Sequence, residues 1–112
     1  MAQRTSLGEF EQMVLLAVLH LDEEAYGNAI CEAIEERTRR AVSRSSLYVT
    51  FDRLEAKGFL KSRLADSSAE RGGRPRRYVE VTAQGLASLA ESRQALLSMW
   101  RGLEDVLEEA SS

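Results

Sequence analysis

Basic residues gathered in the middle of the chain are the clearest chemical signal in the sequence. The whole chain of 112 residues has a net charge of −3. Residues 37–77 nevertheless hold twelve arginines and lysines against four acids, which gives this segment a net charge of +8. The flanking residues 1–36 and 78–112 carry net charges of −7 and −4. A surface that binds a polyanion such as double-stranded DNA is therefore expected within residues 37–77.

The sequence lacks the residues that catalysis or metal binding would need. His20 is the only histidine and Cys31 the only cysteine, so one chain can build neither a Cys/His zinc site nor a disulfide. A nucleophile with a neighbouring base is equally hard to assemble. We therefore expect no enzyme activity, no cofactor and no metal. Cys31 is expected to pack as a small apolar residue, and a sensor role for its thiol stays open.

The apolar runs are too short to cross a membrane. The longest, residues 13–19, has seven residues, whereas a spanning helix needs about 20. The N-terminus has no pattern of a secretory signal. A hydrophobic content of 44% and a charged content of 29% are ordinary for a soluble globular chain. These features predict one compact unit in the cytoplasm, with no membrane partner.

Helical periodicity dominates the first 40 residues. A capping box at residues 6–9, led by Ser6, predicts the start of a first helix. The middle of this helix is apolar almost all round, so we expect a second subunit to cover part of it, at Leu15 and Leu19. The acids at residues 22–24 predict the start of a second helix, which fades near residue 37.

The third helix is the expected DNA-reading element. A short strand is expected at residues 41–42, after which Ser43 can cap the helix. Its inward positions by helical geometry are Leu47, Phe51 and Leu54, followed by Gly58 as a C-terminal glycine. For Tyr48, phosphate contact and packing at the edge of the core are both open. The expected DNA contacts of this helix are small, polar or cationic: Arg44, Ser45, Ser46, Tyr48, Val49 and Arg53.

Two short segments with alternating or β-branched character follow, at residues 59–65 and 78–82. The stretch between them is rich in Ser, Gly and Arg, which predicts a β-hairpin with a basic tip. Arginines on such a wing can reach phosphates or the narrow minor groove. The expected DNA contacts of the wing are Arg71, Gly73, Arg74, Arg76 and Arg77.

Thr82 can cap a last helix that runs to about Ala110. Eight residues of this segment repeat with alternating spacings of three and four, as in a coiled-coil seam: Leu86, Leu89, Arg93, Leu96, Trp100, Leu103, Leu107 and Ala110. Such a helix would extend roughly 40 Å, which is longer than the compact body needs. We therefore expect its outer half to pack on a second copy, with Arg93 at the crossover between its own domain and the partner. The dimer contacts expected there are Leu96, Trp100, Leu103 and Leu107.

These elements describe a mainly α chain with a small β-hairpin. The predicted fold is a winged helix-turn-helix at residues 1–82, joined to a long C-terminal dimerisation helix at residues 83–112. The function it predicts is that of a sequence-specific DNA-binding transcriptional regulator. The alternative is a winged-helix adaptor that binds proteins and not DNA. Such an adaptor would have a flat or acidic third helix, which this sequence lacks.

Several short motifs appear in a fixed order along the chain. They are Tyr26-Gly27, then Ser46-Leu47-Tyr48 with Phe51, Arg53-Leu54-Glu55 and Gly58, then residues 72–78 (GGRPRRY), then Val81-Thr82 and Gly85. In these motifs the sequence resembles the PadR family of bacterial transcriptional regulators, and its short subgroup with a single C-terminal helix in particular. The resemblance implies a homodimeric repressor that binds a pseudo-palindromic operator and is released by a small ligand.

Two positions qualify what this resemblance implies. Family members commonly carry Gly and Pro at the positions of Ser45 and Val49, so the operator sequence does not follow from the family. Multidrug-binding members use a Trp of the C-terminal helix to stack flat aromatic ligands. Trp100 lies about one helical turn further from Thr82 than in those members, so a core position in the dimer and contact with a small aromatic effector both stay open.

Overall fold

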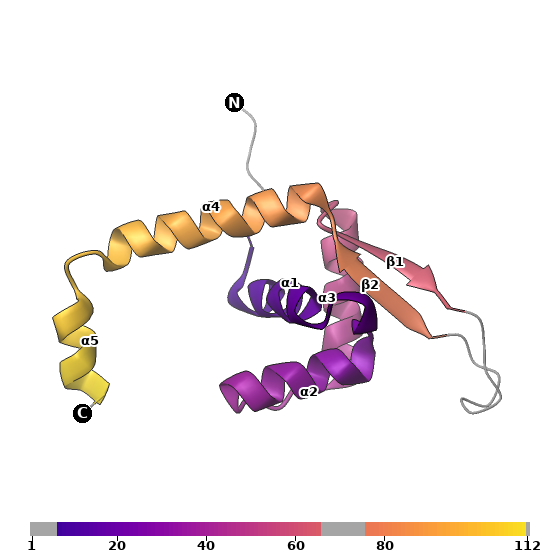
Figure 1. Cartoon of the computed structure of the whole chain (residues 1–112), viewed down its shortest axis with the longest axis horizontal. Coiled ribbons are helices and arrows are strands. Elements are labelled where there is room, and N and C mark those ends of the chain that lie inside the picture. Colours follow the sequence, from indigo (N-terminus) through magenta and orange to yellow (C-terminus); the bar gives the residue numbers. More distant parts are fainter. Residues whose placement is uncertain (1–6, 66–75, 112) are drawn as a thin grey trace.

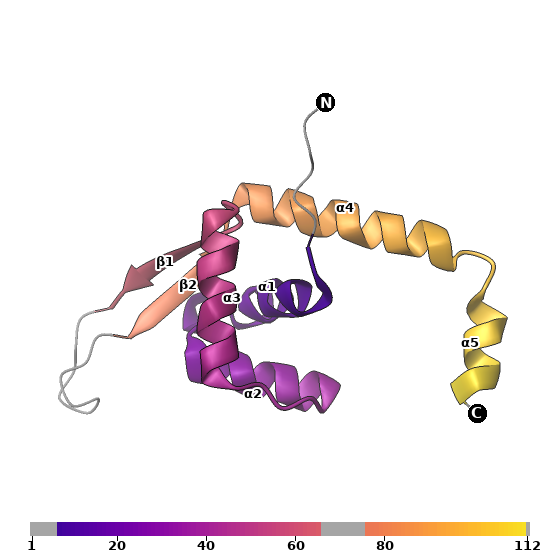
Figure 2. The same ribbon diagram turned by 180° about the vertical axis from the view of Figure 1, so that it is seen from behind.

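The computed structural model describes residues 7–65 and 76–111 (Figure 1). The elements in chain order are α1 (Glu9–Leu21), the 3-10 turn η1 (Asp22–Glu24), α2 (Gly27–Thr38), α3 (Arg44–Ala56), β1 (Leu60–Leu64), β2 (Arg77–Val81), α4 (Ala83–Trp100) and α5 (Glu104–Ser111). The first three helices form a body with the β-hairpin on one side, and α4 passes over it and extends well beyond it (Figures 1 and 2). Within the described ranges, no helix is long and apolar enough to span a bilayer.

The core lies where α1, α2 and α3 meet. Its largest fully buried side chains come from all three helices: Val14, Leu15, Ile30, Leu47, Phe51 and Leu54. Val79 of β2 and Leu89 of α4 close it from the hairpin side and from above. The inward face predicted for the third helix is therefore confirmed. Burial of apolar side chains at helical spacing is what fixes the angle of α3 on the body.

Two helices begin later than the capping box and the acidic residues of the sequence predicted, and the predicted cap Ser6 lies outside the described residues. The N-cap of α1 is Gly8, and its N–H donates to Glu11 Oε1 at 2.8 Å. The carboxylate half of a capping box is thus supplied by Glu11 and not by Glu9. The acids at residues 22–24 form the turn η1, and α2 starts only at Gly27.

Leu15 is wrong as a dimer contact. Its side chain has 0% exposure inside its own chain, so it has no surface to offer a partner. Leu19, one helical turn later, is 44% exposed, so its side chain is accessible to a second subunit. The difference arises because α1 is apolar on both sides, and its own body covers only one of them.

The wing is a two-stranded antiparallel hairpin. Its register runs from Leu60 opposite Val81 to Leu64 opposite Arg77. The strand predicted at residues 41–42 is absent among the described residues, and the sheet is instead extended by an isolated bridge between Tyr26 and Tyr78. The N–H of Val79 also donates to the carbonyl of Ala25 at 2.9 Å. The hairpin is thus bonded directly to the segment that precedes α2.

The start of α4 is held tightly against the end of α3. Thr82 caps α4 by accepting from the N–H of Gly85 at 3.0 Å, and it donates to the carbonyl of Gly58 at 2.7 Å. Gly58 has φ +80°, the left-handed conformation expected of a C-terminal glycine. A Cβ at Gly85 would lie 2.3 Å from the Phe59 carbonyl oxygen, so only glycine allows this approach.

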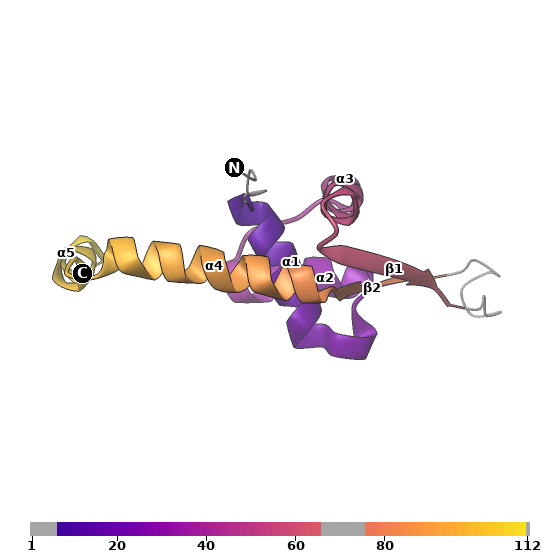
Figure 3. The same ribbon diagram turned by 90° about the horizontal axis from the view of Figure 1, so that it is seen from above.

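The predicted single C-terminal helix is two helices. α4 ends at Trp100, and α5 starts at Glu104 after a turn in which Gly102 has φ +91°. Figure 3 shows α5 turned out of the line of α4. The absence of a Cβ lets Gly102 adopt this conformation at little cost. Leu103 and Leu107 therefore leave the seam to which their heptad spacing assigned them.

Candidate nucleic-acid interface

α3 turns one side to the core and the other to solvent. Figure 2 shows this helix on the outside of the molecule, in front of α1. All six residues that the sequence predicted for DNA contact are exposed on it: Arg44, Ser45, Ser46, Tyr48, Val49 and Arg53. Val49 is 55% exposed on this outer side. A helix with short, polar and cationic residues on its outer side can enter the major groove of B-DNA.

The first turn of α3 is shaped by serines. Ser43 is the N-cap, and its Oγ accepts from the N–H of Ser46 at 3.1 Å. The same Oγ lies 2.9 Å from the Ser46 hydroxyl and 3.4 Å from that of Ser45. Three hydroxyls thus meet at a helix N-terminus, where the backbone dipole attracts anions. Ser46 is part of this cap as well as being exposed.

Tyr48 lies at the edge of the core and not fully in solvent. Its ring packs edge-on against Phe51 with centroids 5.5 Å apart, and it is 38% exposed. A Cβ on Gly27 would lie 2.7 Å from the Tyr48 hydroxyl oxygen. Gly27 therefore makes room for the hydroxyl, which explains why the Tyr26-Gly27 motif of α2 accompanies the Ser46-Leu47-Tyr48 motif of α3.

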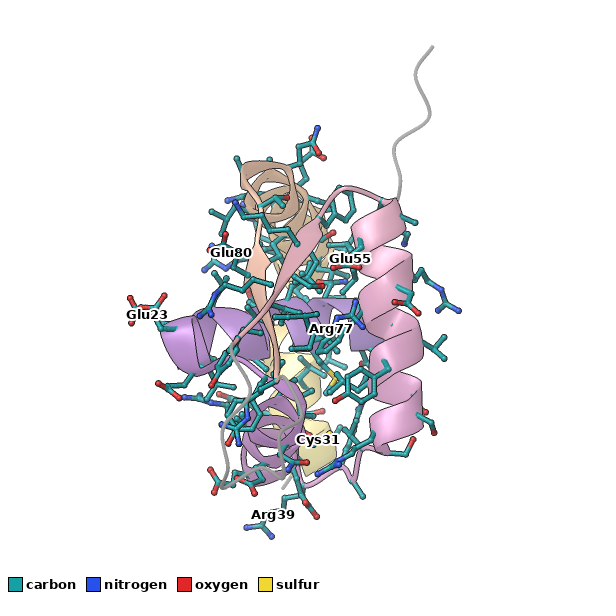
Figure 4. The ribbon with its side chains drawn as sticks, turned by 90° about the vertical axis from the view of Figure 1, so that its right-hand side faces the viewer. Glu23, Cys31, Arg39, Glu55, Arg77 and Glu80 are labelled. Atoms are coloured by element: carbon teal, nitrogen blue, oxygen red, sulfur yellow. The ribbon has the colours of Figure 1, made fainter. Side chains whose placement is uncertain are left out.

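Arg77 joins the base of the wing to α3. Its Nη2 lies 3.0 Å from Glu55 Oε2 and 3.4 Å from Asp52 Oδ1, and its Nε donates to Ser62 Oγ at 3.0 Å. The guanidinium also lies over the Phe51 ring, 5.2 Å from its centroid. Figure 4 shows Arg77 and Glu55 side by side between the hairpin and the helix.

The Arg77 side chain is only 25% exposed, and it is engaged within its own chain. The sequence predicted Arg77 as a DNA contact. The contacts that it makes in the structure hold the wing against α3. Its partners were missed because they lie 15 to 25 residues away in the chain.

The other side of the wing base holds a stack of arginines and tyrosines. Arg76 lies over the Tyr26 ring at 4.0 Å from its centroid, and Arg63 lies over the Tyr78 ring at 4.6 Å. The two tyrosines meet edge-on at 5.6 Å. Stacking on a ring does not neutralise a guanidinium group. The hydrogen bond to Tyr78 raises the pKa of Arg76 above its ordinary value, so this side chain stays charged. This cluster keeps two cations at the point where the tip begins.

The predicted contacts Arg71, Gly73 and Arg74 belong to the tip of the wing, which lies outside the described residues. Their contact with DNA stays a prediction.

Glu11 and Lys57 form a nearly buried ion pair at the C-terminal end of α3. Lys57 Nζ lies 2.8 Å from both carboxylate oxygens of Glu11, and the Glu11 side chain is 8% and the Lys57 side chain 19% exposed. Burial of the carboxyl raises the pKa of Glu11, but hydrogen bonds from Lys57 and Gly8 outweigh it, so the pKa lies below its ordinary value. The pair ties the first turn of α1 to the end of α3. The sequence analysis missed it, because two distant charges carry no local signal.

Cys31 sits on α2 and packs partly buried against the core. Burial raises the pKa of its thiol, so the thiol stays protonated and weakly reactive at neutral pH. Across the described parts of the chain, no three His, Cys, Asp or Glu side chains gather in a way that could hold a metal ion.

An apolar groove of about 390 Å³ runs between α1 and α4. Its lining comes from both helices: Gln12, Leu16, Leu19, Leu86, Leu89, Ala90, Arg93, Leu96, Leu97 and Trp100. Leu96 is 52% and Trp100 44% exposed in the single chain. The sequence placed Leu19, Leu96 and Trp100 on a dimer surface, and the fold brings all three to this one groove.

A three-helix body with an exposed cationic third helix, a basic hairpin and a projecting C-terminal helix defines the class of winged helix-turn-helix transcriptional regulators. Residues 15–91 match the family described as the transcriptional regulator PadR-like family. The chain belongs to this family, and it is a transcriptional regulator, not an enzyme. PadR-family regulators bind DNA.

Individual relatives support the same assignment. The "Transcriptional regulator Rv3488" of Mycobacterium tuberculosis is 38% identical over 98 residues, which cover 83% of this chain and 85% of the relative. A PadR family regulator from Eggerthella lenta superposes with a TM-score of 0.67 at 27% identity, covering 89% of this chain and 87% of the other. The fold is also that of a PadR-like regulator from Bacillus cereus, with a TM-score of 0.69, 24% identity, and coverage of 88% and 90%.

Proposed function

We propose that this chain is a homodimeric repressor that binds a pseudo-palindromic operator. The observation that carries the proposal is the outer face of α3, which exposes Arg44, Ser45, Val49 and Arg53 on a helix fixed from below by the core. Short side chains allow the helix to approach base edges closely, and the two arginines flank them. Val49 would contact a thymine methyl group. The protein would act in the cytoplasm, where bacterial DNA lies.

The wing supplies the sequence-independent part of the binding. Arg63 and Arg76 stay cationic on their tyrosine stack, and the segment between the strands adds Arg71 and Arg74 beside Gly73. Arg77 would contribute by holding the wing at a fixed angle to α3. Phosphate contacts from the wing would then set the register of α3 on the duplex.

The dimer would form through the groove between α1 and α4. Leu16, Leu19, Leu96 and Trp100 expose apolar surface that water would otherwise cover, and their burial against a second copy is favourable. Two-fold symmetry would place the two α3 helices in successive major grooves, about 34–36 Å apart. Arg93 lines the groove and would lie at its edge, where its guanidinium reaches water.

The same groove is the candidate site for an effector. A small aromatic molecule could stack on Trp100, and a volume of about 390 Å³ is in the range of small-molecule sites. Arg93 would pair with an acidic group on such a ligand. Trp100 is the only tryptophan, so its fluorescence reports on this site alone. Quenching by naphthoate together with weaker DNA binding would support effector release, and a fluorescence titration without change would contradict it.

DNA binding is tested by fluorescence anisotropy with labelled duplexes from the promoter upstream of the gene itself. Affinity should fall steeply with salt, with a log-log slope of about −0.9 for each phosphate neutralised. Arg44→Ala and Arg53→Ala should each weaken binding about tenfold or more, as expected for loss of a good base or phosphate contact. Arg101→Ala removes an exposed arginine far from α3 and the wing, and should bind as the wild type does. Absence of salt-dependent binding to any duplex would refute the proposal in favour of a protein-binding adaptor.

A further inference from the structure

α5 is an amphipathic helix whose apolar side has no cover within its own body. Leu103, Val106, Leu107 and Ala110 follow the spacing of one helical stripe, and the first three are 45–62% exposed. The rest of the helix is acidic, with Glu104, Asp105, Glu108 and Glu109. Figures 1 and 3 show α5 standing apart from the three-helix body. An eight-residue helix is only marginally stable in water, so it needs a packing partner.

A second, smaller apolar pocket lies between α1 and α2. It has a volume of about 150 Å³ and is lined by eight residues: Met13, Leu16, Ala17, His20, Ala33, Ile34, Arg37 and Thr38. We call this surface the α1–α2 patch. Arg37 lines it, and Arg40 lies at its edge, with Nη1 3.8 Å from Met13 Sδ. The patch is therefore apolar at its centre, with Arg37 and the ion pair of Arg40 with Glu9 at its rim.

Two features connect the patch with α5 of a second copy. The first is complementarity, since an apolar stripe flanked by four acids matches an apolar pocket that Arg37 lines. The second is continuity, because Leu16 lines both the patch and the α1–α4 groove. A partner helix α4 in the groove would run beside the patch at Leu16, and only residues 101–103 separate the end of α4 from α5. Three residues span at most about 10 Å, so α5 must lie close by.

The geometry points to α5 as an arm that docks on the α1–α2 patch of a second copy of the chain. This inference rests on the proposed dimer and gives Leu103 and Leu107 a contact surface different from the α4 seam. The turn at Gly102 allows α5 to dock there, because it redirects the chain from the groove towards the patch. Each copy then covers the α1–α2 patch of the other, and the two arms lock the dimer reciprocally.

Disulfide trapping between two differently tagged full chains tests the docking. Both chains carry Cys31→Ser, one also carries Val106→Cys on α5, and the other Ala33→Cys in the patch. Mixed dimers should form a covalent heterodimer several-fold faster than the matched pair in which Glu32→Cys replaces Ala33→Cys. Glu32 is the neighbouring residue of α2, exposed and outside the patch. Adding Leu107→Asp to the Val106→Cys chain should slow the trapping several-fold.

Sedimentation of the same mixtures separates the two proposals. A dimer that traps Ala33→Cys no faster than Glu32→Cys would overturn the docking of α5 and leave the repressor proposal standing. A monomer at the concentrations used would overturn the proposed dimer itself. A chain that carries Val106→Cys and Ala33→Cys together, and closes the disulfide within itself, would show that the arm folds back on its own body and would also overturn the docking.

Discussion

Glu11 illustrates at the scale of a single residue how α3 is held in place. Its carboxylate accepts from the N–H of Gly8 and pairs with Lys57 at 2.8 Å through both oxygens. These bonds anchor the first turn of α1, which reaches the proposed dimer groove through Gln12, to the end of α3. A short, nearly buried contact thus connects the part of α1 next to the proposed dimer groove with α3, the helix proposed to read DNA.

Glu11→Gln should lower the free energy of unfolding at neutral pH by about 1–3 kcal/mol, because it removes the charge that satisfies a nearly buried ammonium group. The pKa of Glu11 is lower in the folded state than in the unfolded state. Its stabilising contribution is thus complete above the unfolded pKa and is lost as the pH falls through the folded pKa.

Urea denaturation at neutral and acidic pH checks this prediction, at one protein concentration. The gap between wild type and variant should narrow as the pH falls below the ordinary range of a glutamate. Glu9→Gln is the matched control, since its pair with Arg40 is exposed on both sides and should contribute about 0–1 kcal/mol. A gap that stays constant with pH would mean that Glu11 acts through its shape and not through its charge.

At the scale of elements, Arg77 connects the wing with α3. Four groups surround its guanidinium, two acids and a ring on α3 and a hydroxyl on β1. The Ser62 hydroxyl in turn donates to Glu55 Oε1, which closes a network between the two elements. Such a network is worth more than the sum of its exposed ion pairs.

Arg77→Ala should destabilise the fold by about 1–3 kcal/mol and weaken binding to all DNA sequences alike. The reason is that the wing loses its fixed angle while α3 keeps its base-reading side chains. Thermal melts and anisotropy titrations on two different duplexes measure the two effects. Lys61→Ala, which breaks an exposed pair with Glu80, should leave the melt nearly unchanged. Weaker DNA binding by Arg77→Ala without any loss of stability would instead make Arg77 a direct DNA contact.

The elements differ in how far the sequence could predict them. α3 was predictable, since its apolar positions repeat on one face and Ser43 and Gly58 mark its ends. The break at Gly102 was not. The spacing of three and four continues through it, and one glycine inside a helix costs only about 1 kcal/mol relative to alanine. Spacing describes which residues share a face, but the backbone conformation at one glycine decides whether the face continues.

The candidate site also contains residues whose roles the sequence could predict and residues whose roles it could not. The exposed residues of α3 followed from helical geometry, because a helix with a clear inner face has a defined outer face. The roles of Arg77 and Leu15 did not follow, since each depends on contacts with segments distant in the chain. Sequence spacing places a residue on a helix or strand, and only packing decides whether that residue is free to meet a partner.

At the scale of the whole molecule, charge and apolar surface are separated. The basic segment forms α3 and the wing on one side of the body, whereas α4 and α5 extend the other way (Figure 1). Exposed apolar side chains cluster on the extended part, with Leu96, Leu97, Met99 and Trp100 on α4, Leu103 in the turn that follows, and Val106 and Leu107 on α5. A single chain therefore has one end suited to a polyanion and another suited to a second copy. Dimerisation and DNA binding are expected to be linked, because only a dimer can engage both half-sites.

Leu96→Asp tests this link by placing a carboxylate in the α1–α4 groove. Sedimentation should show a shift from dimer to monomer, because burial of an unpaired charge in an apolar contact is costly. Met99→Asp is the matched control, since Met99 is 76% exposed, lies on the same helix and does not line the groove. The control should stay dimeric.

Anisotropy titrations with a full operator and with one half-site then separate assembly from recognition. Leu96→Asp should bind the full operator only about as well as the wild type binds the half-site, because its α3 and wing are unchanged but the second set of contacts is lost. Met99→Asp should keep the wild-type preference for the full operator. If Leu96→Asp became monomeric and still bound the full operator with wild-type affinity, one copy would be sufficient for recognition, and the pseudo-palindromic operator would have to be abandoned.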